Sequence, residues 1–164
     1  MFNKINFLFV TLFGIGKIKK IPGTFASLAT ALFLFFLFHI LSFSPEIILI
    51  FVIIIFFISL YAVNVFIKDL TNKDPKEVVI DEFIGQSIPI CLYEIAHEGS
   101  KETDQVLTSY FFMFVLFRIF DIVKPYPVSY YDKNFKNSFG VVMDDVCAGL
   151  YVVAVLVLYM VIST

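Results

Sequence analysis

The sequence offers few residues for zinc binding or for covalent phosphate transfer. Its 164 residues include two cysteines, two histidines and a single arginine, Arg118. Cys91 and Cys147 each lie within an apolar run, without a paired spacing or a following phosphate loop, which is typical of small buried hydrophobic residues. His39 lies in an apolar run and His97 in a polar stretch, so a phosphohistidine mechanism lacks its nucleophile and its acid. These shortages argue against a disulfide framework, a zinc site and either covalent route.

Charged residues are also scarce, and long uncharged runs take their place. They make up 16% of the chain, whereas 60% is hydrophobic, well above the apolar share of a soluble domain. The stretch Ile47–Ile67 contains no charge and is long enough to cross about 30 Å of hydrocarbon. Lys17, Lys19 and Lys20 stand where a cleaved signal peptide would need small residues. The sequence therefore predicts one integral membrane domain over residues 1–164, without a cleaved leader or a soluble second domain.

Five apolar runs mark the expected helices, and Pro89 interrupts the third. The runs are Phe25–Phe43, Ile47–Ile67, Phe83–Ala96, Val106–Val123 and Val146–Ile162. The second is a spanning helix by length, the first, fourth and fifth are near the minimum, and the third could either cross or be re-entrant. We expect an all-α integral membrane bundle of about four to five hydrophobic helices.

The positions of the lysines favour one of these two topologies. Lysines precede the first run, follow the second and separate the fourth from the fifth, whereas 44–46 has none and 97–105 has only Lys101. By the positive-inside rule, the three lysine-containing stretches are cytoplasmic. This alternation requires the third run to cross, so we favour five crossings. It also predicts that four polar stretches meet on the cytoplasmic face, namely 14–27, 69–85, 118–127 and 138–149.

The first polar stretch, GIGKIKKIPGTFAS, precedes the first crossing. Proline and glycine break the preceding structure, and Thr24 is placed to cap the helix that follows. A helix N-terminus beside glycines presents free backbone N–H groups that suit a phosphate. An ordinary helix start after a turn explains the same residues, and the spacing of a P-loop is absent.

Five carboxylates stand beside apolar runs, where ionisable groups are costly and usually functional. They are Asp81, Glu82, Asp121, Asp144 and Asp145. Oxygen ligands suit a hard divalent cation, and the lone arginine among them suits an anionic substrate. A solvated helix start explains Asp74 and Glu77 well, but it explains Asp81 and Glu82 poorly because an apolar run begins at once.

Arg118 and Asp121 are one helical turn apart and can pair. The pair could simply be a satisfied ion pair within the membrane. A chain that otherwise uses lysine nevertheless has a planar, bidentate donor here, which favours recognition of a phosphate or carboxylate. Small residues near the last acids, such as Gly149, permit close helix packing.

Four segments in order resemble the bacterial phosphatidylglycerophosphatase A family across nearly the whole chain. They are GIGKIKKIPGTFAS, DPKEVVIDEFIGQ, FVLFRIFDIVKPYP and GVVMDDVCAGLY. The resemblance implies a magnesium-dependent phosphatase of the bacterial inner membrane, with its active site facing the cytoplasm. Its implied reaction removes the terminal phosphate of phosphatidylglycerophosphate to give phosphatidylglycerol, with membrane lipids and no nucleic acid as partners.

Carried over by motif position, the resemblance assigns roles to individual residues. The implied catalytic residues are Asp81, Glu82, Asp121, Asp144 and Asp145. The implied Mg²⁺ ligands among them are Glu82, Asp121, Asp144 and Asp145, and the implied substrate-binding residues are Thr24, Ser27, Arg118 and Lys124. The alternative is a small proton- or ion-coupled transporter, since intramembrane acids also mark ion paths. A transporter site should lie near the membrane midplane, whereas these acids cluster at helix ends.

Overall fold

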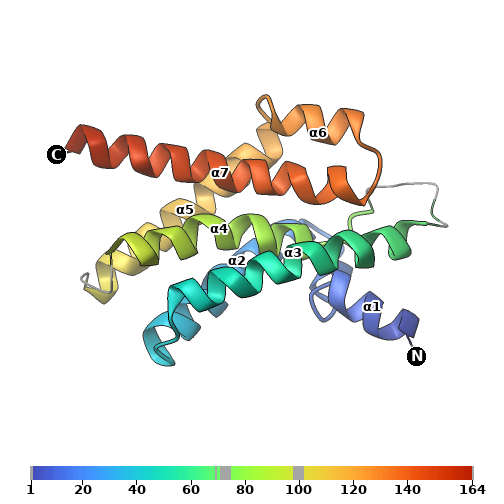
Figure 1. The fold of residues 1–164 in the computed structure, drawn as a ribbon, viewed down its shortest axis with the longest axis horizontal. Helices are drawn as coiled ribbons and strands as arrows, with labels where there is room; N and C mark the ends of the chain where they lie inside the picture. Colours follow the sequence, from blue (N-terminus) through green and yellow to red (C-terminus); the bar gives the residue numbers. More distant parts are fainter. Residues whose placement is uncertain (1, 69, 71–74, 98–101, 164) are drawn as a thin grey trace.

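The computed structural model describes residues 2–68, 70, 75–97 and 102–163, and these ranges contain helices but no strand. Figure 1 shows them as an elongated bundle. The α-helices are α1 Phe2–Val10, α2 Pro22–Phe35, α3 Pro45–Ile67, α4 Ile80–His97, α5 Thr103–Val123, α6 Val128–Asn134 and α7 Ser138–Ser163. A 3₁₀ turn, η1 (Ile15–Lys17), precedes α2, and a π-helical turn, η2 (Phe36–Ile40), continues it. The all-α prediction is confirmed.

Four segments of the described chain are long and apolar enough to cross a membrane. They are Pro22–Ile40, Pro45–Ile67, Thr103–Val123 and Ser138–Ile162. Their outward surfaces carry large apolar side chains, as the exposed Ile50, Phe57 and Ile58 of α3 illustrate. So much exposed apolar surface is unfavourable in water and favourable in lipid. The protein is an integral membrane helical bundle, as predicted.

The helix α4 is different, because it is polar and lies inside the bundle. It packs against α2, α3, α5 and α7 and buries Gln86, Ser87 and Cys91 among them. Its 18 residues include Pro89 and yet form one continuous helix, about 27 Å long at 1.5 Å per residue. The third apolar run is therefore a full-length helix and does not fold back on itself.

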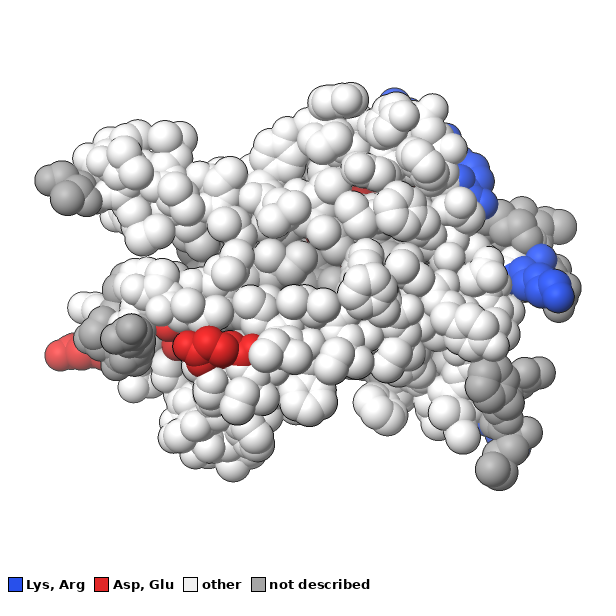
Figure 2. All heavy atoms as spheres, in the orientation of Figure 1, with Lys and Arg blue, Asp and Glu red and all other residues white. Residues whose placement is uncertain are grey.

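The helices alternate in direction along the long axis. In Figure 1, α2, α4 and α7 run one way, and α3 and α5 run back. The beginnings of α2, α4 and α7 and the end of α5 consequently meet at one end of the bundle, as the predicted topology requires. Figure 2 shows one face of the molecule. Lys and Arg side chains lie at the end where these helix ends meet, Asp and Glu side chains lie at the opposite end, and almost no charged side chain lies between them.

Parts of two predicted loops fall outside the described residues. Asp74 and the segment 98–101 are among them. Glu77 lies in a turn just before α4, where it is exposed. At the opposite end, the exposed Glu102 and Asp104 lie at the beginning of α5.

Two helix starts differ from the sequence prediction. The helix α2 begins at Pro22, with Ile21 at the capping position and no side-chain cap, so Thr24 lies inside the first turn and the prediction that it caps the helix is wrong. Proline favours this first helical position because its fixed φ suits the helix and its missing N–H is not needed there. The helix α7 begins at Ser138, so Asp144 lies nearly two turns inside it, not at its start.

Candidate active site

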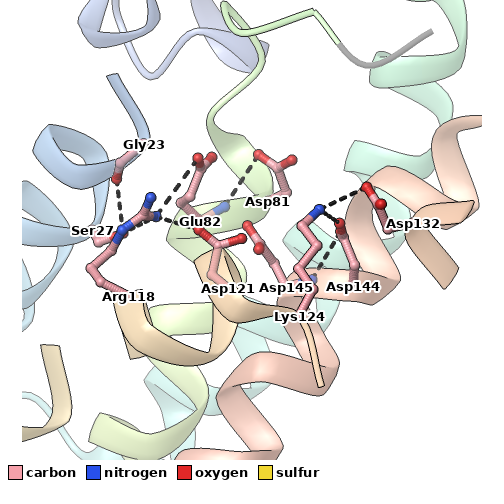
Figure 3. Close-up of polar contacts among 10 residues, drawn as sticks. All are labelled: Gly23, Ser27, Asp81, Glu82, Arg118, Asp121, Lys124, Asp132, Asp144 and Asp145. Carbon is pink, nitrogen blue, oxygen red and sulfur yellow. Dashed lines mark hydrogen bonds and ion pairs between the residues drawn. The ribbon is translucent and has the colours of Figure 1, made fainter. Parts of the chain in front are cut away.

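Three carboxylates from two helices meet at the end of the bundle where α4 begins. Oxygen atoms of Asp81 and Glu82 on α4 and of Asp145 on α7 all lie within 4.8 Å of one another. Asp81 is 7% exposed and Asp145 is 3% exposed. Asp121 is a charged neighbour of both Glu82 and Asp145, and Figure 3 shows these side chains converging from α4, α5 and α7.

The start of α4 explains how two adjacent acids contribute to one site. Neighbouring helical residues point about 100° apart, but Asp81 and Glu82 lie in the first turn, at the rim of the helix. The carboxylate of Asp81 accepts a hydrogen bond from the Glu82 backbone N–H at 3.2 Å. Glycine at position 149 lets α7 approach α4 closely, because a Cβ there would overlap the carbonyl oxygen of Gly85. This contact brings Asp145, one turn before Gly149, to the beginning of α4.

Arg118 connects α5 to α2 and α4 beside the carboxylates. Its Nη1 lies 2.8 Å from Asp121 Oδ2 and 4.0 Å from Glu82 Oε1. The same atom donates a hydrogen bond to Ser27 Oγ at 3.3 Å (Figure 3). The predicted pairing of Arg118 with Asp121 is confirmed. A Cβ on Gly23 would overlap Glu82 Oε1 and lie 3.2 Å from Arg118 Nη1, so glycine allows α2 to begin against these groups.

Lys124 forms a second polar contact at the same end of the bundle. Its Nζ lies 2.7 Å from both Asp144 Oδ2 and Asp132 Oδ1. Burial alone would lower the pKa of Lys124, but the charges of Asp144 and Asp132 and the hydrogen bonds to them raise it above its ordinary value. The two ion pairs orient Asp144 and join the end of α5 to α6 and α7.

The site contains more acidic than basic side chains, so its charge can accommodate a cation. Arg118 pairs with Asp121, and Lys124 pairs with Asp144 and Asp132. Asp145 has no ion pair within the described part of the chain, although it is almost fully buried. Buried carboxylates are normally paired or coordinate a metal. An oxygen-only donor set of this kind fits Mg²⁺ better than zinc or copper.

Two further atoms of the site lack hydrogen-bond partners among the described residues. They are Glu82 Oε2 and Arg118 Nε, both buried. Buried polar atoms are nearly always satisfied by protein, water or a ligand. The free acceptor on Glu82 suits a cation, and the free donor on Arg118 suits an anion.

The structure brings most of the predicted residues to this end, in two groups. Asp81, Glu82 and Asp145 form the close cluster, so Asp81 joins the candidate metal ligands although it was expected only as a catalytic residue. Asp121 is held by Arg118, and Asp144 is held by Lys124. The remaining substrate-binding candidates, Ser27 and Thr24, lie in the first turns of α2, and only Ser27 contacts Arg118.

Asp132 is the residue of this constellation that the sequence interpretation missed. It lies on α6, a short helix between the last two long ones, and reaches Lys124 from there. No local pattern in the sequence marks it, because Asp132 belongs to a short polar stretch that also contains Lys133 and Lys136. The pairing depends on how α6 folds against α7, which only the tertiary structure reveals.

Comparison with known proteins agrees with this geometry. The family model described as phosphatidylglycerophosphatase A matches residues 8–160. The chain belongs to the phosphatidylglycerophosphatase A family. It is 36% identical to phosphatidylglycerophosphatase A of Haemophilus influenzae, over 94% of this chain and 88% of that protein. It is 30% identical to phosphatidylglycerophosphatase A of Escherichia coli, over 84% of this chain and 73% of that protein.

A third relative in the comparison has a different name. A candidate phosphatidylinositol-3-phosphatase of Bacteroides thetaiotaomicron is 34% identical, over 85% of this chain and 83% of that protein. No solved structure matches the chain. All three relatives are bacterial and all are named as phosphatases of phospholipids. Membership of the family confirms the resemblance seen in the four sequence segments and makes the protein a phosphatase.

Proposed function

We propose that this membrane phosphatase hydrolyses the terminal phosphomonoester of phosphatidylglycerophosphate, with Mg²⁺, to give phosphatidylglycerol and phosphate. Two relatives over most of the chain are named for this activity. The observation that carries the proposal is the buried cluster of Asp81, Glu82 and Asp145 beside Arg118, at one end of a membrane bundle. A phospholipid head group can reach such a place without leaving the bilayer.

The metal would be held by Asp81, Glu82 and Asp145, with Asp121 beside them. Bound there, Mg²⁺ would act as a Lewis acid on the phosphoryl oxygens. The chain supplies the rest of the arrangement. Burial excludes bulk water from the carboxylates, and electrostatic attraction is stronger in such surroundings.

The phosphate would be received by Arg118 and the first turn of α2. Asp121 fixes the guanidinium at 2.8 Å, and Ser27 accepts a second hydrogen bond from it. The unpartnered Nε of Arg118 is then available to a phosphate oxygen. The backbone at Gly23 borders the same groups, and helix N-termini favour anions. Lys124 contributes indirectly, because it holds Asp144 in place.

We place the protein in the bacterial cytoplasmic membrane, with five crossings and the site facing the cytoplasm. The end of the bundle that carries the site also carries Lys17, Lys19 and Lys20 before α2 and Lys133 and Lys136 before α7, all exposed. The positive-inside rule assigns such an end to the cytoplasm. α4 would be the fifth crossing, packed against the four apolar helices.

A transport function is less consistent with the position of the acids. The clustered carboxylates lie in the first two turns of α4 and α7, at one end of the bundle. A carrier needs its site near the midplane, accessible from both sides in turn. The family assignment supports hydrolysis and not transport.

Phosphatidylinositol 3-phosphate is the second candidate substrate. The observation that favours it is the name of the Bacteroides thetaiotaomicron relative. Like phosphatidylglycerophosphate, this lipid carries a phosphomonoester on a head group with a hydroxyl on the neighbouring carbon. Phosphatidic acid lacks that hydroxyl, and so the three lipids form a useful comparison.

The proposal is tested by phosphate release from the purified full-length protein in mixed micelles. Each of the three lipids is supplied with Mg²⁺, and in parallel with excess EDTA. We expect turnover of phosphatidylglycerophosphate that requires Mg²⁺. Preference for phosphatidylinositol 3-phosphate would favour the second candidate, and unchanged turnover in EDTA would remove the metal from the proposal. Asp145→Asn provides the matched inactive protein, because it removes one carboxylate charge at nearly constant volume.

A further inference from the structure

Gln86 is a buried polar residue that the site described so far does not use. It lies on α4, one turn after Glu82, and is 0% exposed. Neither its Nε2 nor its Oε1 has a hydrogen-bond partner in the described structure. Nearby buried hydroxyls are satisfied, since Ser27 donates to the Gly23 carbonyl and Ser87 to the Phe83 carbonyl. An unsatisfied buried carboxamide destabilises the fold, so its presence calls for an explanation.

Helix geometry places the carboxamide of Gln86 on the side of α4 that carries Glu82. Residues four apart lie on the same face of a helix, so Gln86 shares a face with Glu82. Helical side chains lean toward the N-terminus of their helix, which for α4 is the end that carries Glu82. The two other unpartnered buried atoms, Glu82 Oε2 and Arg118 Nε, belong to residues whose charged groups are 4.0 Å apart. The unsatisfied atoms of Gln86 and Glu82 therefore belong to one face of α4, and Arg118 lies against that face at Glu82.

The depth of Gln86 indicates which part of a lipid it could meet. One helical turn places it about 6 Å farther from the beginning of α4 than Glu82. A lipid with its phosphomonoester at Arg118 must extend from there into the bilayer, in the direction in which α4 runs. The head-group atoms next to the phosphate then pass the level of Gln86. A carboxamide offers a donor and an acceptor without charge, which suits an alcohol better than a second phosphate or an acyl chain.

Building on the proposed function, we infer that Gln86 binds the head-group hydroxyl next to the phosphate-bearing carbon. It thereby selects lipids with a polyol phosphomonoester over phosphatidic acid. Phosphatidylglycerophosphate carries this hydroxyl between its two phosphates. A site that hydrogen-bonds a substrate hydroxyl discriminates strongly against an analogue without it, because the buried polar group is then left unpaired.

A positioning role for Gln86 predicts a different result from recognition of the hydroxyl. If Gln86 only held Glu82 or Arg118 in place, its loss would slow every substrate to the same extent. The contribution of the hydroxyl is isolated by a double-mutant cycle that removes the carboxamide from the protein and the hydroxyl from the lipid. The altered lipid has a propanediol phosphate head group, which keeps the length and charge of the natural one.

The experiment measures kcat/KM of the full-length protein and of Gln86→Met on both lipids, with Mg²⁺. For the unaltered protein we expect a preference for the hydroxyl-bearing lipid of about 5- to 150-fold, the effect of leaving one buried polar group unsatisfied. For Gln86→Met we expect the preference to fall to within about 3-fold of unity. Gln105→Met, the same substitution at an exposed position on α5, should keep the full preference. Thermal unfolding should show Gln86→Met at least as stable as the unaltered protein, since it removes an unsatisfied polar group.

The possible failures are distinguishable. Equal preference in the unaltered protein and Gln86→Met would overturn the inference alone, and so would an unaltered protein that shows no preference. A lower unfolding temperature with equal losses on both lipids would assign Gln86 a structural role. Absence of phosphate release from either lipid by the unaltered protein would overturn the proposed function, and this inference with it.

Discussion

Gly85 on α4 faces Gly149 on α7, and the two backbones come closer than any side chain would allow. A Cβ on Gly149 would overlap the carbonyl oxygen of Gly85, and a Cβ on Gly85 would lie 2.5 Å from the carbonyl oxygen of Asp145. The Gly85 carbonyl also lacks the usual donor four residues later, because that residue is Pro89. This contact sets the distance between the two helices that carry the carboxylate cluster.

Gly149→Ala should lower activity without removing any functional group. The added methyl must push α7 away from α4, and overpacking of this kind costs about 1–3 kcal/mol. The displacement also moves Asp145 from Asp81 and Glu82, and misplacement by about 1 Å can cost on the order of 100-fold in rate. We expect lower kcat and a lower unfolding temperature. Leu150→Ala, at an exposed position on the same helix, should leave both nearly unchanged.

Removing single charges should show which carboxylates are needed for activity and distinguish them from those in the exposed turn before α4. Glu82→Gln, Asp81→Asn and Asp145→Asn should each lower kcat by roughly 100-fold or more, the scale at which metal ligands and electrostatic groups act. Asp121→Asn and Asp144→Asn should also be severe, because they release Arg118 and Lys124 from their partners. Phosphate release and thermal unfolding are measured together.

The matched control for these variants is Glu77→Gln, in the exposed turn before α4. It removes a carboxylate only a few residues from the cluster, but one that solvent surrounds, so the effect should stay within about 2-fold. A loss at Glu77 comparable to the loss at Glu82 would show that general electrostatics, and not a defined site, controls the rate.

Lys124→Met should destabilise the protein by a similar amount across neutral pH. Asp144 and Asp132 would lose their common cation, at a cost of about 1–3 kcal/mol, between an exposed and a buried ion pair. Because the pKa of Lys124 is raised in the folded protein, its contribution is complete below the ordinary lysine value and is lost only as pH rises through the raised value. Unfolding temperatures measured between about pH 6 and 9 should therefore differ by a constant amount from the unaltered protein.

Lys133→Met is the control for this series, since Lys133 is exposed on the same short helix, α6. It should match the unaltered protein at every pH. A stability difference for Lys124→Met that changed with pH within this range would mean that Lys124 titrates there, contrary to the two ion pairs seen in the structure.

The features that could be predicted from the sequence are those with a local physical signature. The uncharged run Ile47–Ile67 predicts a spanning helix because of length and hydrophobicity alone. The spacing of Arg118 and Asp121 predicts their ion pair because residues three apart meet on a helix. The alternation of lysine-rich loops predicts that the beginning of α4 and the end of α5 lie together, as Glu82 and Arg118 do in Figure 3.

The features that could not be predicted depend on contacts between distant segments. Nothing in the sequence indicated that Lys124, a candidate substrate-binding residue, would pair with Asp144 and Asp132, because these contacts depend on how α6 folds back on α7. The carboxamide of Gln86 could be placed on the same face as Glu82 from spacing alone. Its lack of a hydrogen-bond partner among the described residues depends on how the neighbouring helices pack around it, which the spacing does not determine.

The last prediction concerns topology, on which a single cytoplasmic site depends. Single cysteines are introduced in place of Glu77, Glu102 or Asn134, which are all exposed. They report on the turn before α4, the connection between α4 and α5, and the segment after α5. Cys91 and Cys147 are 0% and 8% exposed, so they should react little with a membrane-impermeant maleimide. In intact cells we expect labelling at Glu102 only, and in inverted vesicles at Glu77 and Asn134 only.

This pattern follows from the lysines and from the energetics of the site. Carboxylates on opposite sides of the bilayer could not share one cation. To meet, they would have to be buried in the hydrocarbon between the two surfaces, which is costly for charged groups. Labelling of Glu77 and Glu102 from the same side would show that α4 does not cross, although it is long enough. Labelling of Asn134 from outside, together with Glu77, would leave the site intact but turn it away from the cytoplasm. Either result would require a different route for the lipid to Arg118 and the carboxylates.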